Sequence, residues 1–337
     1  SSSTQVRDRR PRRYNGRLRA AGVSRSPEAS ASEPGRRGPK PVHDPWRPID
    51  VLFESEPLSG GGSERAMTVF MVGAECPMRC VYCDLWQHTL DERTPEGALA
   101  AQLEVALARL DDRGWPLSDT RVKLYNASNF FEPRAVPDRD AMAIADRMRG
   151  ARRVVVESHP GLLGQRCQRF AERLASGDTR LEVAMGLETA HPKALRQMRK
   201  GADLDDFAKA AQWLREREIA LRIFLLVGVP FIDQGDQVAW LERSVERACA
   251  LGAERIALIP TRATVPEMKA LASAGAFEPP TLALVEQALE AAWSVVDGVS
   301  QDVMVSVDPW DLELLAAGVP DGARRIARLQ QIAASRR

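Results

Sequence analysis

Two kinds of segment alternate along the chain from residue 67 onward. Short segments rich in apolar and β-branched residues are followed by longer ones in which apolar residues recur every three or four positions. The short segments predict strands and the longer ones predict amphipathic helices. The expected strands are residues 67–73, 122–126, 153–157, 181–187, 220–228 and 255–259, with a possible further strand at 302–307. The expected helices are residues 95–110, 138–148, 162–175, 203–218, 236–251 and 282–296.

The first of these helices carries the clearest sequence signals. Thr94 is a residue type that can cap a helix N-terminus, and Pro95 suits the first helical position. Leu99, Leu103 and Leu107 form one apolar stripe along the turns that follow. We therefore expect the helix to begin at Pro95 with Thr94 as its cap.

Six successive strand and helix units with no obvious break between them predict an α/β fold with a parallel sheet. The expected architecture is a partial (β/α)6 barrel of the TIM type with a C-terminal helical extension. In such a sheet the chemistry lies at the carboxyl ends of the strands. The expected organisation is a disordered leader over residues 1–45, a lead-in segment over 46–66, the barrel over 67–300 and a strand and helix extension over 301–337.

The leader consists mainly of Ser, Arg, Pro and Gly and has few large aliphatic side chains. It can bury too little apolar surface to offset its ordering entropy, which is the basis for expecting disorder. Residues 1–50 hold 12 Lys and Arg against 5 Asp and Glu, and the rest holds 35 against 41, so the net charge of +1 conceals a basic leader and an acidic body. The leader is interpreted as a basic arm that touches phosphates or as a solvated tail.

The sequence contains no signal for a membrane. No apolar run reaches the roughly 18 residues that a membrane helix needs, and the first 30 residues lack the apolar core of a signal peptide. Five cysteines in 337 residues are too few, and odd in number, for a disulfide scaffold. A cytoplasmic protein is therefore expected.

Three of the five cysteines, Cys76, Cys80 and Cys83, lie directly after the first expected strand. Soft thiolate ligands at this spacing can hold an iron–sulfur cluster, and three ligands leave one iron of a four-iron cluster open. A zinc site is the competing interpretation, although structural zinc prefers four ligands and no second cysteine pair follows. Cys167 and Cys249 fall inside expected helices and are interpreted as buried core residues.

With the aromatic Tyr82 before the third cysteine, the motif CxxxCxφC resembles that of the radical S-adenosylmethionine (SAM) superfamily. The resemblance implies a [4Fe–4S] cluster held by Cys76, Cys80 and Cys83, with SAM chelating the fourth iron and Tyr82 beside it. One electron from the cluster would cleave SAM to methionine and a 5′-deoxyadenosyl radical, which abstracts a hydrogen from the substrate. The electron would come from a donor of the flavodoxin or ferredoxin type.

The ends of the next two expected strands resemble SAM-binding segments of one branch of this superfamily, which contains the elongator catalytic subunit, the methylthiotransferases and oxygen-independent coproporphyrinogen dehydrogenase. The resemblance places Asn126 and Ser128 at the SAM ammonium group. It places Glu157, which begins an ExxP segment, at the ribose or the amino group.

The fourth and fifth expected strands end in segments similar to the same branch. The resemblance places Glu188 near the ribose or methionine part of SAM and Lys200 near its carboxylate. The resemblance of the Gly-x-Pro end of the fifth strand implies that the backbone of Val227 and Gly228 lines the adenine. Arg222, which begins that strand, is expected at the opposite end of the barrel.

Over residues 46–313 the chain also resembles the radical SAM subunit of archaeosine synthase and its bacterial relatives. The segments that carry this resemblance are 83–89, 129–137, 157–160, 186–189 and 310–313. It implies a base in tRNA as the substrate. Two alternatives stay open: a radical SAM enzyme that acts on a small metabolite, peptide or lipid, and a non-catalytic iron–sulfur or zinc-binding scaffold.

Overall fold

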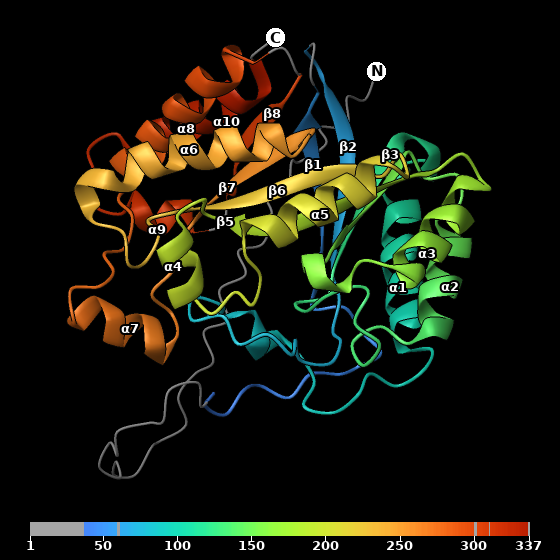
Figure 1. Ribbon diagram of the computed structural model, residues 1–337. Helices are drawn as coiled ribbons and strands as arrows, with labels where there is room; N and C mark the ends of the chain where they lie inside the picture. Colours follow the sequence, from blue (N-terminus) through green and yellow to red (C-terminus); the bar gives the residue numbers. More distant parts are fainter. Residues whose placement is uncertain (1–36, 59–60, 300–301, 310, 336–337) are drawn as a thin grey trace, which may run out of the picture. The chain divides into compact units, whose positions relative to one another are not determined.

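Eight strands form one continuous sheet in which each strand pairs with its neighbours in the sequence (Figure 1). The first two strands pair antiparallel, and all later pairs are parallel. The computed structural model describes residues 37–58, 61–299, 302–309 and 311–335. Residues 1–36 of the predicted leader and Trp310 of the 310–313 segment lie outside the described residues.

The strands are β1 (Asp50–Pro57), β2 (Ser63–Phe70), β3 (Thr120–Tyr125), β4 (Arg153–Glu157), β5 (Arg180–Glu188), β6 (Ala220–Val227), β7 (Arg255–Pro260) and β8 (Met304–Val307). β3 to β8 confirm the predicted strands to within two residues at each end. β2 begins four residues before the predicted first strand and ends before residue 71. β1 lies in the segment that was predicted only as a lead-in.

The helices are α1 (Ala98–Asp112), α2 (Asp138–Arg147), α3 (Gln165–Ala175), α4 (Pro192–Gln197), α5 (Leu204–Arg215), α6 (Gln237–Ala250), α7 (Pro266–Ser273), α8 (Leu282–Asp297), α9 (Leu312–Leu315) and α10 (Gly322–Ser335). The six predicted helices are confirmed as α1, α2, α3, α5, α6 and α8, with ends within three residues of the prediction. The short helices α4 and α7 were not predicted.

The predicted start of α1 is wrong. The helix begins at Ala98, and Gly97 in the left-handed region is its N-cap. Thr94 is used elsewhere, because its Oγ1 accepts from the Ala74 N–H at 2.8 Å and donates to the Ala135 carbonyl at 2.7 Å. The buried carboxylate of Asp140 on α2 caps α1 instead, by accepting from the N–H groups of Gly97 (2.8 Å) and Ala100 (3.0 Å).

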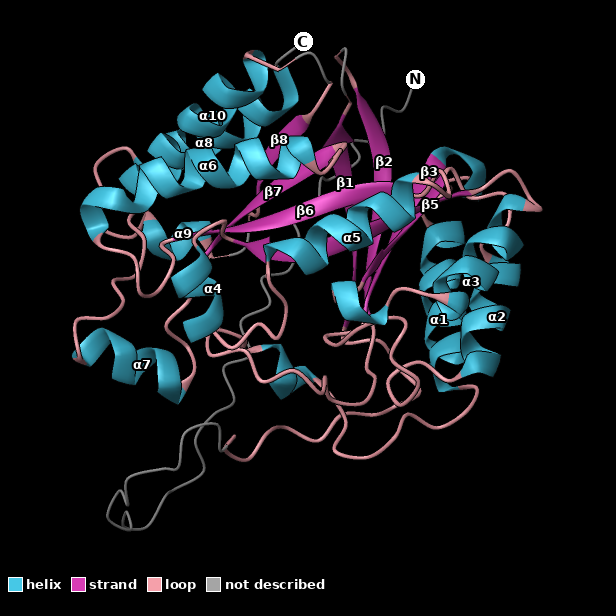
Figure 2. Ribbon diagram, in the orientation of Figure 1, coloured by secondary structure: helices cyan, strands magenta, loops and turns pink. Residues whose placement is uncertain are grey.

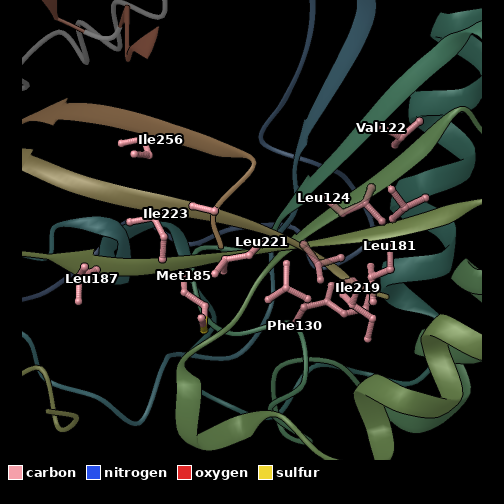
Figure 3. Packing of buried hydrophobic residues seen from close by; sticks show 14 of the residues in the cluster. Val122, Leu124, Phe130, Leu181, Met185, Leu187, Ile219, Leu221, Ile223 and Ile256 are labelled. Carbon is pink, nitrogen blue, oxygen red and sulfur yellow. The ribbon is translucent and has the colours of Figure 1, made fainter. Parts of the chain in front are cut away.

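The two faces of the sheet differ in chemistry. Alternate strand residues on one face form the main hydrophobic core with the helices, and Figure 3 shows Val122, Leu124, Leu181 and Met185 among them. In Figure 2, α1, α2 and α3 pack beside one another, and so do α6 and α8. Cys167 and Cys249 are buried in this core, as predicted.

The opposite face is concave and carries charged side chains. Arg222 on β6 reaches Glu56 on β1 at 3.2 Å, although the two strands are far apart in the order of the sheet. α10 also contacts both edge strands, β1 and β8. The sheet is therefore curled into an open half-barrel, which confirms the predicted partial TIM-like barrel.

The part of the predicted disordered leader that the structure describes, residues 37–45, has no helix or strand but makes defined contacts. Arg37 and Lys40 pair with Glu75 at 2.5 and 3.1 Å, and Lys40 also pairs with Asp91 at 3.0 Å. Composition could not reveal these ion pairs, because they depend on carboxylates 35 to 51 residues later. Among the described residues, no helix is long and apolar enough to cross a membrane.

Candidate active site

The loop after β2 carries the three clustered cysteines at the carboxyl ends of the parallel strands. Cys76 Sγ accepts hydrogen bonds from Asn129 Nδ2 at 3.0 Å and from the Met78 N–H at 3.3 Å. The Val81 N–H donates to the Met198 carbonyl, just after α4, at 3.0 Å. The loop is thus held from two sides, by the segment after β3 and by the end of α4.

Burial raises the pKa of two of the thiols in this loop, those of Cys83 and Cys76. It raises the pKa of Cys83 to about 12, with Cys80 and Asp84 adding to the effect, and it raises the pKa of Cys76 as well. The thiols of Cys76 and Cys83 are therefore protonated at neutral pH in the protein alone. Positively charged iron is the kind of partner that would hold them as thiolates.

A hydrogen-bonded trio joins the cysteine motif to two later segments. Tyr82 Oη donates to Glu188 Oε1 at 2.7 Å, and Lys200 Nζ lies 2.8 Å from the same oxygen and 3.3 Å from Tyr82 Oη. Burial lowers the pKa of Lys200, but Glu188 and then Cys80 outweigh it and keep the pKa above its ordinary value. Lys200 is therefore a fixed cation beside the cysteine loop, whereas Arg199 pairs with Glu267 at 2.6 Å.

The backbone at the end of β5 is shaped around this trio. Glu188 has a positive φ of 65°, and the pairing of β5 with β6 is irregular between Gly186 and Glu188. A Cβ on Gly186 would lie 2.1 Å from Glu188 Oε1 and 2.8 Å from Lys200 Nζ. A side chain at position 186 would displace the carboxylate and the ammonium group from this arrangement. The positive φ of Glu188 is backbone strain, which is concentrated at functional sites.

Asn126 and Ser128, after β3, hold buried oxygen atoms that have no hydrogen-bond partner within the described part of the chain. These atoms are Asn126 Oδ1 and Ser128 Oγ. A buried polar atom without a partner costs free energy, so it indicates that a ligand completes the site. Both atoms can accept hydrogen bonds, which fits the ammonium donor that the sequence predicts there.

The remaining predicted residues lie at the ends of β4 and β6. Glu157 is partly buried, and burial raises its pKa to about 7 against the opposing effect of Lys200. Gly228 has a φ of +78°, and a Cβ there would lie 2.9 Å from Pro280 Cδ. The Val227 side chain packs in the main core and its carbonyl accepts from the Thr261 N–H at 2.9 Å, so its own contacts are with the protein.

Asn129 is a site residue for which sequence reasoning predicted no role. It is buried, donates to Cys76 Sγ, and accepts from the His159 N–H through Oδ1 at 2.6 Å. His159 Nδ1 accepts from the Gly161 N–H, so its Nε2 is assigned as donor to the Lys200 carbonyl at 3.1 Å. The sequence signal was only the position of Asn129, three residues after Asn126.

The cysteine loop is also tied to the segment after β7. Asp84 pairs with Arg262 at 3.1 Å and accepts from Thr264 Oγ1 at 3.0 Å. Val81 and Trp86 pack with Met268 of α7 in a small separate hydrophobic cluster. These contacts set the position of the loop, although neither Asp84 nor α7 was predicted to do so.

The described residues contain no group of three His, Cys, Asp or Glu side chains close enough to share one metal ion. A [4Fe–4S] cluster does not require three side chains around one metal ion, because each cysteine binds a different iron. The three thiols on one loop, the orphaned acceptors at Asn126 and Ser128, and the charged Lys200 together fit a cluster and a zwitterionic ligand.

Comparisons with known proteins agree with this geometry. The family model of the Radical SAM superfamily matches residues 71–242, which is just over half of the chain. An uncharacterised protein of Methanocaldococcus jannaschii is 20% identical over 227 residues, which is 65% of this chain and 62% of that protein. Archaeosine synthase subunit beta of Methanosarcina acetivorans is 22% identical over 221 residues, which is 62% of this chain and 60% of that protein. The chain thus spans about three fifths of the length of these two relatives.

Among solved structures, Elp3 of Methanocaldococcus infernus with its first 46 residues deleted is similar in fold. The TM-score is 0.50 at 13% sequence identity, and the match covers 70% of this chain and 59% of that one. This likeness supports the half-barrel alone. The cysteine loop and the family match over residues 71–242 decide the family: the chain belongs to the radical SAM superfamily, whose members are enzymes that bind a [4Fe–4S] cluster and SAM.

Proposed function

We propose that this enzyme holds its cluster through Cys76, Cys80 and Cys83 and generates a hydrogen-abstracting radical that acts on a base in tRNA. When bound, the cluster would supply one electron that cleaves SAM to methionine and a 5′-deoxyadenosyl radical, and that radical would remove a hydrogen atom from the substrate. We expect the electron to come from a flavodoxin or ferredoxin type of donor. Five free thiols suit a reducing compartment such as the cytoplasm.

The trio of Tyr82, Glu188 and Lys200 is the observation that carries the proposal. Lys200 offers a fixed positive charge to the SAM carboxylate, and Glu188 orients it through the contact at 2.8 Å. Glu188 also anchors Tyr82 and, through it, the chain between Cys80 and Cys83. A scaffold for a structural metal would have no need for a strained glutamate and a buried lysine at this position.

The other proposed contacts divide the SAM molecule among the strand ends. Asn126 and Ser128 present buried acceptors for the ammonium group. Glu157 presents a carboxylate for ribose hydroxyls, which donate to carboxylates in nucleotide sites. We assign the adenine to the backbone at the end of β6, Val227 and Gly228, on the side that Pro280 and Thr261 do not contact.

The tRNA substrate is supported by the relative that is an archaeosine synthase subunit and by the excess of Lys and Arg in residues 1–50. A small metabolite, peptide or lipid is the second candidate, because the superfamily site binds SAM whatever the substrate.

The two candidate substrates are separated by adding unfractionated tRNA to the reconstituted enzyme with SAM and dithionite. Formation of 5′-deoxyadenosine that rises with tRNA and changes a tRNA nucleoside supports the first, and a rate unaffected by tRNA contradicts it.

The cluster assignment is tested by Cys80→Ala, which we expect to abolish the broad visible absorbance and SAM cleavage after anaerobic reconstitution. The reason is that two cysteines cannot hold a site-differentiated cube. Cys249→Ala is the matched control, since Cys249 is buried in the helical layer and should leave the spectrum unchanged. An unchanged spectrum in Cys80→Ala, or about one zinc and no iron per chain in the wild type, would contradict the assignment.

A further inference from the structure

A second concave site lies at the amino ends of the strands, opposite to the cysteine loop. It is a cavity of about 470 Å³, within the range of roughly 300–1,000 Å³ that is typical of small-molecule sites. Its wall contains five arginines at or next to the starts of β3, β4, β5 and β7, and three acidic residues. The arginines are Arg121, Arg152, Arg153, Arg180 and Arg255, and the acidic residues are Glu64, Glu254 and Asp302.

Carboxylates in this wall are shared between several guanidinium groups. Glu64 pairs with Arg121 at 2.5 Å, with Arg152 at 2.6 Å and with Arg255 at 3.1 Å. Below it, the fully buried Glu182 accepts from Arg121, Arg153 and Arg222. One carboxylate cannot satisfy three guanidinium groups, each of which has five N–H donors.

Positive charge therefore exceeds negative charge in this part of the half-barrel. The described network contains seven cations against six carboxylates when Asp302, which lines the cavity, is counted. The cations are Arg121, Lys123, Arg152, Arg153, Arg180, Arg222 and Arg255, and the carboxylates are Glu54, Glu56, Glu64, Glu182, Glu254 and Asp302. Burial and then the nearby Arg121 lower the pKa of Arg255, as expected where cations crowd.

Two arginines at the rim are exposed to solvent, and one of them, Arg152, also pairs with Glu64 through Nε. The side chains of Arg152 and Arg180 are 45% and 59% exposed, and Arg180 lies 4.0 Å from Glu254, the limit of an ion pair. Arg153 lies deeper, at 14% exposure, and its Nη1 already pairs with Glu182 at 3.0 Å and Glu254 at 2.7 Å, which leaves its other N–H groups for a ligand. The cavity thus offers guanidinium groups at two depths, which a flat surface patch would not.

We propose that this cavity binds the phosphate group of a small ligand, either inorganic phosphate or a phosphomonoester. Guanidinium groups pair with phosphate through parallel N–H···O bonds, and a phosphate has enough oxygens to accept from Arg152, Arg153 and Arg180 together. A carboxylate has only two oxygens and would leave part of this donor set unused. The excess positive charge supplies the attraction.

The proposal is tested by isothermal titration calorimetry on the cluster-reconstituted full chain at constant ionic strength, with inorganic phosphate and with ribose 5-phosphate. We expect one saturable site, and Arg180→Ala and Arg152→Ala should each weaken binding by about tenfold, the effect of losing one charge-assisted contact. Arg169→Ala is the matched control. Its side chain is 58% exposed and lies 3.8 Å from Asp138 on the outer helices, so affinity should stay within about twofold.

Three outcomes would overturn the proposal. The first is no saturable heat with either probe up to about 10 mM, well above the Kd range of a specific anion site. The second is equal weakening in Arg169→Ala, which indicates general charge screening. The third is a loss of tRNA affinity in Arg180→Ala with unchanged phosphate affinity, which makes the cavity an RNA contact surface. The titration needs no turnover, so a negative result leaves the proposed radical chemistry untouched. A thermal unfolding curve confirms that each rim variant is folded.

Discussion

Asn129 shows how one side chain can couple the cysteine loop to the strands beneath it. Its amide donates to Cys76 Sγ at 3.0 Å and accepts from the backbone of His159 at 2.6 Å. The hydrogen bond from the His159 N–H fixes the orientation of the Asn129 amide, so that its Nδ2 points toward Cys76 Sγ. Asn129 is therefore a positioning residue that also places a hydrogen-bond donor on a cluster sulfur.

We expect Asn129→Ala to make the midpoint potential of the reconstituted cluster more negative by roughly 40 mV. A donor to sulfur stabilises the extra negative charge of the reduced cluster, and about 1 kcal/mol corresponds to roughly 40 mV for one electron. An EPR-monitored redox titration without SAM measures the shift. Ser128→Ala is the control, and a potential that is unchanged or more positive in Asn129→Ala contradicts the role.

At the same scale, single residues of the candidate site were predictable and their contacts were not. Tyr82 was predicted from the cysteine motif, and Glu188 and Lys200 were predicted together from the end of the fourth expected strand and the basic residue that follows it. Their shared hydrogen bonds depend on a positive φ at Glu188 and on the absence of a side chain at Gly186. Tyr82 lies 106 residues before Glu188 and 118 residues before Lys200, and no spacing rule links residues that far apart in the sequence.

At the scale of elements, helix α1 depends on a cap supplied by its neighbour. Asp140, in the first turn of α2, accepts from two N–H groups at the start of α1 and is fully buried. The local signal from Thr94 and Pro95 was overridden because the Thr94 hydroxyl bridges two backbone groups of other segments. The start of α1 is thus set by a tertiary partner, whereas α5 and α8 are capped by the local residues Asp203 and Thr281.

We expect Asp140→Ala to lower the free energy of unfolding by about 2–3 kcal/mol, since two buried N–H groups lose their acceptor. Chemical denaturation of the cluster-free protein measures the change. Asp138→Ala is the control in the same helical turn, because Asp138 is 66% exposed and pairs with Arg166, and it should cost less than about 1 kcal/mol. Equal decreases in the free energy of unfolding of the two variants would contradict the role of Asp140 as the cap of α1.

Strand β1 illustrates a second limit of element prediction. Its sequence alternates Val51 and Phe53, which join the core, with Glu54 and Glu56, which face the concave side. A short strand of this kind, ending at Pro57, does not resemble the apolar strands of a parallel sheet. Its antiparallel pairing with β2 followed from tertiary structure.

At the scale of the whole molecule, the charged layer inside the half-barrel holds distant strands together. Glu182 on β5 pairs with cations on β3, β4 and β6, and Glu56 on β1 pairs with Arg222 on β6. Burial by itself would raise the pKa of Glu182, but Arg222, Arg121 and Arg153 outweigh it and hold the pKa at about 2. The carboxylate is therefore charged throughout the physiological range.

We expect Glu182→Gln to lower the free energy of unfolding at pH 7 by about 3–5 kcal/mol, because it leaves buried guanidinium groups without their counter-charge. A depressed pKa stabilises the fold above the ordinary pKa near 4.5, and this contribution is lost as pH falls toward 2. The difference between wild type and variant should therefore shrink in acid. Denaturation at pH 7 and pH 3 measures it, with Glu104→Gln on the outer face as control; a difference that does not depend on pH contradicts the assignment.

The sequence by itself determined the alternation of strands and helices, the cysteine loop and the residues at the strand ends. These follow from local periodicity and short motifs, which need no knowledge of distant contacts. Only the tertiary structure decided the cap of α1, the pairing of β1, the trio around Glu188 and the arginine cavity. Each of these joins groups far apart in the chain, and their interaction energies depend on distance in space and on burial, which no window of sequence contains.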